Sequence, residues 1–379
     1  MQMGDNIIAA SGQPPFFKVS NPAAVGLPAP EIRHGDAVRA MVRSLSGFQK
    51  EALVLSARTG TMWRLVSDEG AYLNGHDAAP CPLAFLTVGM ISSYMNEITA
   101  LADREGVRLR NLRLIQNNFY TMQGSMRQRT MTGGALPVEL EVQVETDADD
   151  AKLSGLLSNA VHASPLNGLM RGKLPSLFTL SKNGQQIHTG EAQALDAPVV
   201  DLPDGAEPEA KETDLTLIAR EGMSPGKSVA KGTEKSELLA ERLRKDGLKE
   251  IEQHLYSPHG SIFRFLSDEG KDARAPDAVS YISAGIAFCF MTQFGRMASM
   301  EKLNLPKYAI VQDTHFSLGG ASGGTGKAGE ADPVETHVHL TTDESDDIAR
   351  DMLDVSEKTC FLHAFCRTDL KTRLKVTRM

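Results

Sequence analysis

The chain has 379 residues, of which 41% are hydrophobic, and this is enough for two packed domains of ordinary size. Its formal net charge of −8 and the lack of a basic block argue against a nucleic-acid surface, and no apolar run approaches the length of a membrane span. Because the first residues lack the features of a signal peptide and four cysteines are too few for a disulfide scaffold, we expect a cytoplasmic protein with reduced thiols.

The sequence contains an internal repeat. At an offset of 196 residues, Pro137–Glu139 aligns with Pro333–Glu335, and at an offset of 200 residues Ser67–Gly70 aligns with Ser267–Gly270. A single four-residue insertion after Gly70 reconciles the two offsets. A repeat this long indicates duplication of a whole domain rather than a solenoid of small units.

The repeat predicts the domain boundaries. Residues 1–35 are rich in Pro, Ala and Gly and are expected to form an arm or to remain mobile. Residues 36–190 are the first predicted domain, residues 191–232 a linker and residues 233–379 the second domain.

Each domain has the same predicted order of elements: a short helix, two strands, a long apolar helix, a strand, an alternating strand, an amphipathic helix and a final strand. In the first domain these are residues 37–45, 52–56, 62–66, 83–101, 112–116, 138–144, 150–163 and 176–180. In the second domain they are residues 236–245, 255–256, 262–266, 279–297, 308–312, 334–340, 345–358 and 373–376. This order predicts an α+β fold.

Two cysteines of the second copy are replaced by serines in the first. Cys289 aligns with Ser93 and Cys360 with Ser164, so the members of both pairs are 71 residues apart. A single buried cysteine is usually an apolar filler. Two independent fillers have no reason to be exchanged together for serine, whereas two thiols that react with each other do. We therefore interpret Cys289 and Cys360 as a redox pair.

The surroundings of these cysteines resemble the OsmC/Ohr family. Phe263–Gly270 resembles the strand and turn before that family's central helix, Pro276–Phe290 resembles the helix with its cysteine, and Thr359–Phe361 matches the second cysteine. Ser164–Asn167 resembles a Cys-Pro motif without its thiol. The resemblance covers residues 36–180 and 236–376. It implies two tandem domains, each with an antiparallel sheet wrapped round a buried central helix, that form an internal pseudo-dimer.

The resemblance also implies a thiol peroxidase that acts on organic hydroperoxides. Cys289 would attack the peroxide and Cys360 would resolve the resulting sulfenic acid to a disulfide, which a lipoyl-type dithiol reductant would reset. No cofactor, metal, nucleic acid or membrane is implied. Copy one would be structural and would wall the thiol site, and the chain could still form a homodimer.

The residues that activate the thiol are less clear from the sequence. Relatives carry a Glu about ten residues before the first cysteine, paired with an Arg, but here that position is Val279 and the nearest acid is Asp277. Arg264, with Arg274 and Arg64 as alternatives, is a candidate for the Arg. Val279 leaves open a non-catalytic protein that binds a small apolar or acyl ligand in the cleft between the domains.

Four other features receive structural interpretations. Cys81 is expected to be an incidental buried thiol, whereas Cys366 could compete as a resolving thiol. His337 and His339 share one face of a strand without an evident third ligand, so a polar sheet face is favoured over a metal site. The glycine-rich segment 319–327 lacks P-loop spacing and is expected to be a hairpin loop.

Overall fold

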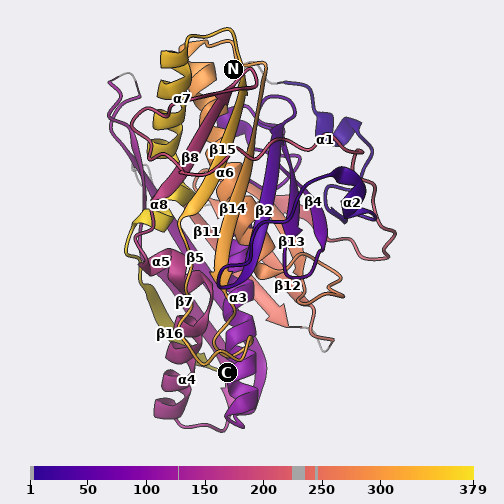
Figure 1. The fold of residues 1–379 in the computed structure, drawn as a ribbon. Helices are drawn as coiled ribbons and strands as arrows, with labels where there is room; N and C mark the ends of the chain where they lie inside the picture. The colour runs from indigo at the N-terminus through magenta and orange to yellow at the C-terminus, as the bar shows by residue number, and fades with distance from the viewer. Residues whose placement is uncertain (1–3, 127, 224–234, 244–245) are drawn as a thin grey trace.

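Two long apolar helices, α3 (Pro82–Arg104) and α6 (Ala278–Glu301), lie at the centre of the protein between two sheets (Figure 1). The structure is a computed structural model that describes residues 4–126, 128–223, 235–243 and 246–379, with residues 235–243 described as backbone only. It confirms a mixed α+β fold. By length and composition α6 could cross a membrane, but its most apolar 18-residue stretch is buried inside the protein.

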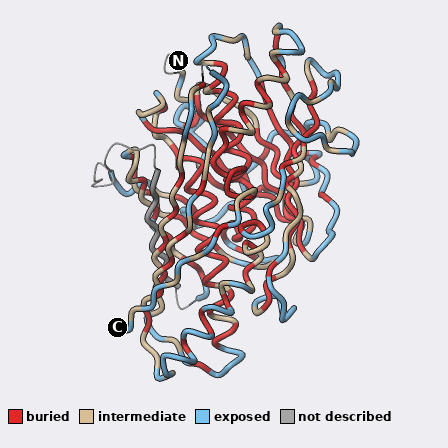
Figure 2. Tube along the Cα trace, turned by 90° about the vertical axis from the view of Figure 1, so that its left-hand side faces the viewer, coloured by how far each residue is buried: buried red, intermediate tan, exposed pale blue. Residues whose placement is uncertain are grey.

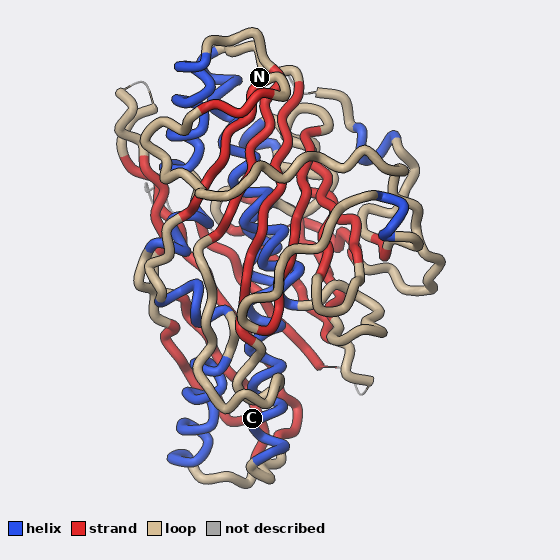
Figure 3. The backbone as a smooth tube through the Cα atoms, viewed as in Figure 1, coloured by secondary structure: helices blue, strands red, loops and turns tan. Residues whose placement is uncertain are grey.

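Among the described residues, the strands form two eight-stranded sheets (Figure 3). The first has the order β1 (Phe17–Lys18), β4 (Met62–Ser67), β3 (Lys50–Ser56), β2 (Gly35–Ser44), β14 (Lys307–Ser317), β15 (Val334–Thr341), β8 (Ser176–Lys182) and β9 (Gln185–Ile187). The second has the order β10 (Ile218–Met223), β13 (His259–Ser267), β12 (Lys249–Tyr256), β11 (Lys235–Leu243), β5 (Leu109–Gln123), β7 (Val138–Thr146) and β16 (Thr372–Arg378), with β6 (Thr132–Ala135) paired to β5.

Each sheet combines strands from both halves of the chain. β2 pairs with β14, and the equivalent strands β11 and β5 pair in the same antiparallel way. β8 then lies parallel to β15, as β16 does to β7. The sheets are therefore mixed, and the expectation of an antiparallel sheet is corrected at these two parallel pairs. β8 joins the sheet that holds β14 and β15 of the second half, and β16 joins the sheet that holds β5 and β7 of the first half.

Shorter helices complete the structure. They are α1 (Ile7–Ala10), α2 (Pro22–Val25), the 3-10 turn η1 (Ala71–Leu73), α4 (Asp150–Ala163), α5 (Leu166–Arg171), α7 (Asp346–Thr359) and α8 (Phe361–Arg367). Asp149 and Ser345 cap α4 and α7, since their side chains accept hydrogen bonds from backbone N–H groups of the first turn. The two amphipathic helices and both central helices lie where the sequence predicts them.

The short helices predicted at residues 37–45 and 236–245 are wrong. Residues 35–44 form β2 and residues 235–243 form β11, while residues 244–245 lie outside the described residues. β2 is a central strand between β3 and β14, and both of its faces are buried. A strand buried on both faces shows no alternation, so its pattern resembles that of a buried helix until its partners are known.

The segments outside the repeat also contact the sheets. β1 pairs with β4, and Phe16, Phe17 and Val19 are buried, so the described part of the arm is packed. Residues 218–223 of the predicted linker form β10, whereas residues 224–232 lie outside the described residues. Buried residues run through the middle of the molecule, along the helices and the inner faces of the sheets (Figure 2).

The two central helices contact each other at equivalent glycines. A Cβ at Gly89 would lie 2.5 Å from the Ala278 carbonyl oxygen and 2.6 Å from Ile282 Cγ1, and a Cβ at Gly285 would lie 2.5 Å from Leu86 N. Gly89 is the repeat partner of Gly285, and Leu86 is the partner of Ile282. The helices thus meet antiparallel through reciprocal contacts, as two subunits do about a two-fold axis.

Candidate functional site

The structure brings Cys289 and Cys360 together. Cys289 lies in the middle of α6, Cys360 lies between α7 and α8, and the two thiols are hydrogen-bonded to each other. Both are buried, and neither is part of a disulfide. Burial, followed by the hydrogen bond and charge of Cys289, raises the pKa of Cys360 well above its ordinary value, against the opposing N–H groups of His363 and Leu362. Cys360 is thus held as a neutral thiol beside Cys289.

The first half of the chain walls this thiol site. A small cavity of about 10 Å³, roughly room for one water molecule, opens beside Cys289. Its lining comes from the loop after β4, the start of α3, β12, the α6 face after Cys289 and the start of α8. The residues are Glu69, Tyr72, Leu73, Cys81, Pro82, Leu83, Leu255, Cys289, Thr292, Gln293, Arg296 and Phe361. On the other side, Gly133 of β6 packs on the backbone of Thr359 and Cys360.

Two cations and one carboxylate surround Cys289. Arg296 lies about two helical turns beyond Cys289 and lines the same cavity. Burial lowers the pKa of Arg296, while Glu69 and Cys289 raise it. Lys50 is fully buried, and burial lowers its pKa against the effects of Glu69, Asp68 and Cys289. Glu69 accepts hydrogen bonds from Thr292 Oγ1 at 3.2 Å and from Tyr72 Oη at 2.5 Å. Arg296 and Lys50 thus place two basic groups near Cys289, with the Glu69 carboxylate beside them.

Arg264 and Asp277 are not brought to the thiols. Arg264 lies on β13 in an ion pair with Glu221 at 2.9 Å, and Asp277 caps the start of α6, about three turns before Cys289. The alternatives Arg274 and Arg64 are paired with acids as well, Arg274 with Asp246 and Asp268 and Arg64 with Glu51.

The crossing of α3 and α6 explains why Asp277 lies far from Cys289. Since α3 and α6 run antiparallel, the start of each helix lies beside the middle of the other. The residue that faces Cys289 from a helix start is therefore Leu83 of the first half, not Val279. Arg296 was missed, but the repeat carries a signal for it, because Ala100 occupies the equivalent position in the copy that has Ser93 and Ser164 in place of the two cysteines.

The serine pair forms an equivalent site in the first half. Ser93 Oγ and Ser164 Oγ lie 2.8 Å apart in a hydrogen bond. The cavity beside them is about 460 Å³ and is lined by Asp36, Arg58, Ser93, Asn96, Glu97, Thr99, Ala100, Pro165, Glu269, Gly270, Ala278, Val279, Ser317, Leu318, Gly319, Ser322 and Gly323. Lys249 and Glu269 form an ion pair at 3.6 Å in this half of the structure. They occupy the positions that Lys50 and Glu69 occupy near the thiols. We call this cavity and its serine pair the serine site.

The serine site has a different balance of charge. Gln293 of the thiol site is replaced by Glu97, which accepts hydrogen bonds from the backbone N–H of Ala321 and from Ser322. Cys81 is replaced by Asp277, whose pKa is raised to about 7 by burial and then by Glu269 and Asp36. Because Ala321 and Ser322 donate these hydrogen bonds to Glu97 of α3, the glycine-rich segment 319–327 packs on α3 as a loop.

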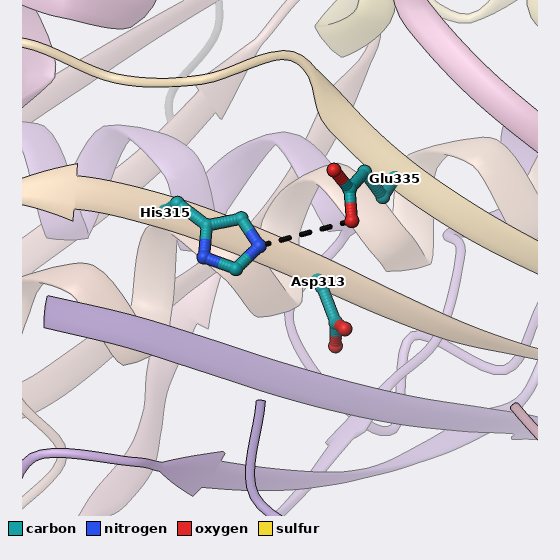
Figure 4. Close-up of side chains that lie close together, drawn as sticks. All are labelled: Asp313, His315 and Glu335. Atoms are coloured by element: carbon teal, nitrogen blue, oxygen red, sulfur yellow. Dashed lines mark ion pairs between the residues drawn. The ribbon is translucent and has the colours of Figure 1, made fainter. Parts of the chain in front are cut away.

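A separate polar cluster lies on the first sheet (Figure 4). Asp313 and His315 on β14 and Glu335 on β15 lie within 4.8 Å of one another. Such groups can ligate a metal ion. However, Arg39 forms a fork with Asp313 at 2.7 and 2.6 Å, and Arg33 forms another with Glu335 at 2.6 and 3.1 Å. The guanidinium groups neutralise both carboxylates, so we interpret the cluster as an ion-pair network.

The remaining histidines and cysteines have polar or buried surroundings. His337 Nδ1 is hydrogen-bonded to Thr179 Oγ1 at 2.9 Å, and His339 Nε2 to the Val200 carbonyl at 3.0 Å. Burial raises the pKa of Cys366 to about 12. Cys81, expected to be incidental, lines the thiol cavity with Cys289.

The family comparison matches the second half of the chain. Residues 270–375 match the family model described as OsmC-like protein. Among solved structures, the chain is similar to an OsmC-like hydroperoxide resistance protein from Jannaschia sp. CCS1, with 20% identity, 34% of this chain and 81% of that chain covered, and a TM-score of 0.19. No curated protein matches the chain. The family match contains both Cys289 and Cys360.

Proposed function

Because residues 270–375 match the OsmC-like family model, we propose that the chain is a thiol-dependent peroxidase that reduces organic hydroperoxides. The observation that carries the proposal is the contact of Cys289 with Cys360 in a cavity that also holds Arg296. Two thiols in contact can form a disulfide without rearrangement of the fold.

The two cysteines have different roles. The Cys289 thiolate attacks one oxygen of the hydroperoxide, the O–O bond breaks, and the leaving alkoxide takes up a proton to depart as an alcohol. The sulfenic acid formed on Cys289 condenses with the Cys360 thiol, which forms the disulfide and releases water. Since its surroundings keep Cys360 protonated, it suits the resolving role, whereas the cations suit Cys289 to the attack.

Arg296 and Lys50 stabilise charge during the first step. A guanidinium or ammonium group beside the sulfur favours the thiolate and also the negative charge on the departing oxygen. Glu69 holds Arg296 by charge and is itself fixed by Thr292 and Tyr72. A lipoyl-type dithiol then reduces the disulfide by exchange in a reducing compartment such as the cytoplasm.

The cavity limits what reaches the thiol. Its volume of about 10 Å³ fits only the oxygen end of a hydroperoxide, which is about the size of a water molecule. Leu73, Leu255 and Phe361 offer apolar surface to the organic part. This favours organic hydroperoxides as the substrate class.

We also propose that the two halves, residues 36–190 and 233–379 joined by a linker, are tandem OsmC-like domains that form an internal pseudo-dimer. The equivalent strand order of the two sheets and the reciprocal contacts of Gly89 and Gly285 support this proposal. The alternative, an apolar or acyl ligand in the cleft between the halves, has less support. The larger cavity carries Asp36, Glu97 and Glu269 and suits polar molecules.

The test is stopped-flow consumption of an organic hydroperoxide by the wild type, Cys289→Ser and Cys360→Ser with a dithiol donor. We expect Cys289→Ser to lose consumption, and Cys360→Ser without the donor to consume about one equivalent and then stop, because Cys289 is the thiol that attacks the peroxide. Cys366→Ser is the matched control for replacing a buried cysteine. Wild-type consumption no faster than that of Cys289→Ser would overturn the proposal.

A further inference from the structure

A third cysteine lies at the thiol site. Cys81 precedes Pro82, the first residue of α3, and lines the same small cavity as Cys289 although the two are far apart in the sequence. The proposed chemistry uses Cys289 and Cys360 and leaves Cys81 without a role. In the serine site the equivalent residue is Asp277, so the thiol is specific to the site that has the other two thiols.

The helix crossing sets the position of Cys81. Gly285 packs on Leu86, and the helices run antiparallel from this contact. Cys289 lies one turn after Gly285, and Pro82 lies one turn before Leu86, so Cys289 and the start of α3 lie side by side. The equivalent contact of Gly89 with the Ala278 carbonyl oxygen confirms this geometry on the other side of the crossing.

One buried cation serves both thiols. The charges of Cys289 and Cys81 both raise the pKa of Lys50, against the effect of burial. The start of the 23-residue helix α3 adds a partial positive charge at Cys81. Both features favour the thiolate form that attacks a disulfide.

The three thiols differ in exposure. Cys360 is 0% exposed, Cys289 3% and Cys81 9%. A disulfide between Cys289 and Cys360 therefore lies in the deepest position, where an external dithiol has poor access to either sulfur. Thiol–disulfide exchange requires an approach to one sulfur of the bond.

Building on the proposed peroxidase function, we propose that Cys81 is a third redox-active thiol, which relays the disulfide outward to the reductant. The Cys81 thiolate attacks Sγ of Cys289, the Cys81–Cys289 bond forms, and Cys360 leaves as a thiolate that takes up a proton. An external dithiol then attacks Sγ of Cys81 and releases the Cys289 thiolate for the next peroxide. The second thiol of the reductant attacks its own mixed disulfide and frees Cys81. Exchange changes no overall oxidation state, and the dithiol supplies both electrons.

The test traps the outer disulfide in the full-length Cys360→Ser variant. After treatment with diamide, or separately with an organic hydroperoxide, non-reducing peptide mapping is expected to show a Cys81–Cys289 crosslink. Cys81→Ser/Cys360→Ser is expected to lack the crosslink. With hydroperoxide that variant leaves a dimedone adduct on Cys289. In the otherwise native chain, Cys81→Ser is expected to slow reduction of the protein disulfide by a dithiol about tenfold or more, while Cys366→Ser, the matched control, reduces at the wild-type rate.

The two arms separate this inference from the peroxidase proposal. If the protein consumes peroxide normally but diamide leaves Cys81 unmodified, the relay through Cys81 is overturned and the peroxidase proposal stands. A crosslink with diamide, but no reaction with hydroperoxide, overturns the peroxidase and supports the juxtaposition of Cys81 and Cys289. A crosslink from Cys289 to Cys366 in place of Cys81 also overturns the relay.

Discussion

The thiol site and the serine site are equivalent places in one fold with different chemistry. Both lie where the middle of one central helix meets the start of the other, and both keep a buried lysine and a glutamate, Lys50 with Glu69 and Lys249 with Glu269. The thiol site has a cavity of about 10 Å³ and Arg296, while the serine site has about 460 Å³ and Ala100.

The difference separates the features that both sites share from the features on which the proposed reaction depends. The glycine contacts, the lysine and the glutamate occur at both sites, so they are part of the common framework. The pair of thiols and Arg296 occur at one site only, so they distinguish the half for which we propose the peroxidase reaction. Four predictions test this division, beginning with the largest expected effect.

The first prediction adds the missing thiols to the serine site. Ser93→Cys with Ser164→Cys, in a Cys289→Ser/Cys360→Ser background, is expected to form a disulfide, because the serine oxygens are 2.8 Å apart. Linking residues 71 positions apart stabilises the folded state by up to about 4 kcal/mol. Urea unfolding with and without reductant measures this gain.

The same variant is expected to leave organic hydroperoxide unconsumed, because Ala100 stands where the thiol site has Arg296. Consumption at the wild-type rate would show that two thiols suffice and that the cation is part of the framework. Adding Ala100→Arg to the variant is expected to increase consumption.

The second prediction removes the cation from the thiol site. Arg296→Gln is expected to slow peroxide consumption about hundredfold, because the thiolate and the departing oxygen lose a charged neighbour. Alkylation of Cys289 by iodoacetamide near neutral pH should slow as well, which a purely structural role would not produce. Arg264→Gln, at an exposed ion pair, is the matched control, and equal rates for the two variants would contradict the assignment.

The third prediction tests the shared framework. Gly89→Ala and Gly285→Ala are each expected to destabilise the protein by about 1–3 kcal/mol, since the added Cβ would lie 2.5 Å from backbone atoms of the facing helix. Gly155→Ala in α4 is the control, because a Cβ there meets nothing within 4 Å, and it should stabilise by about 0.5–1 kcal/mol. Denaturant unfolding gives all three values, and a neutral change at either crossing glycine would contradict the close contact.

The fourth prediction concerns the acid that replaces Cys81 in the serine site. The pKa of Asp277 is raised from 3.8 to about 7 in the folded protein, first by burial and then by Glu269 and Asp36. A raised pKa in the folded state means that folding takes up a proton, so stability is lost as pH rises from about 4 through about 7. Asp277→Asn keeps the cap of α6 and removes this loss.

The advantage of Asp277→Asn over the wild type should therefore grow by about 1–2 kcal/mol between pH 5 and pH 8, as measured by denaturant unfolding at the two pH values. Asp149→Asn, at the exposed start of α4, is the matched control, with a change below about 0.5 kcal/mol at either pH. An advantage for Asp277→Asn that is independent of pH would contradict the raised pKa.

The sequence by itself determined the repeated order of elements and the pair of cysteines. Both central helices are long and apolar on all sides, and both amphipathic helices have a capping residue and a clear period, so local pattern was enough. The exchange of Cys289 and Cys360 for serines pointed to the thiol pair, because the two copies could be compared position by position.

Only the tertiary structure decided what surrounds the thiols. β2 and β11 each pair with one strand of their own half and one of the other half. β2 is buried on both faces, so its residues carry no local period. The antiparallel crossing set Cys81, Glu69 and Lys50 against Cys289 and moved Asp277 to the serine site. Such contacts join residues about 200 positions apart, and no local pattern encodes which helix start will face which thiol.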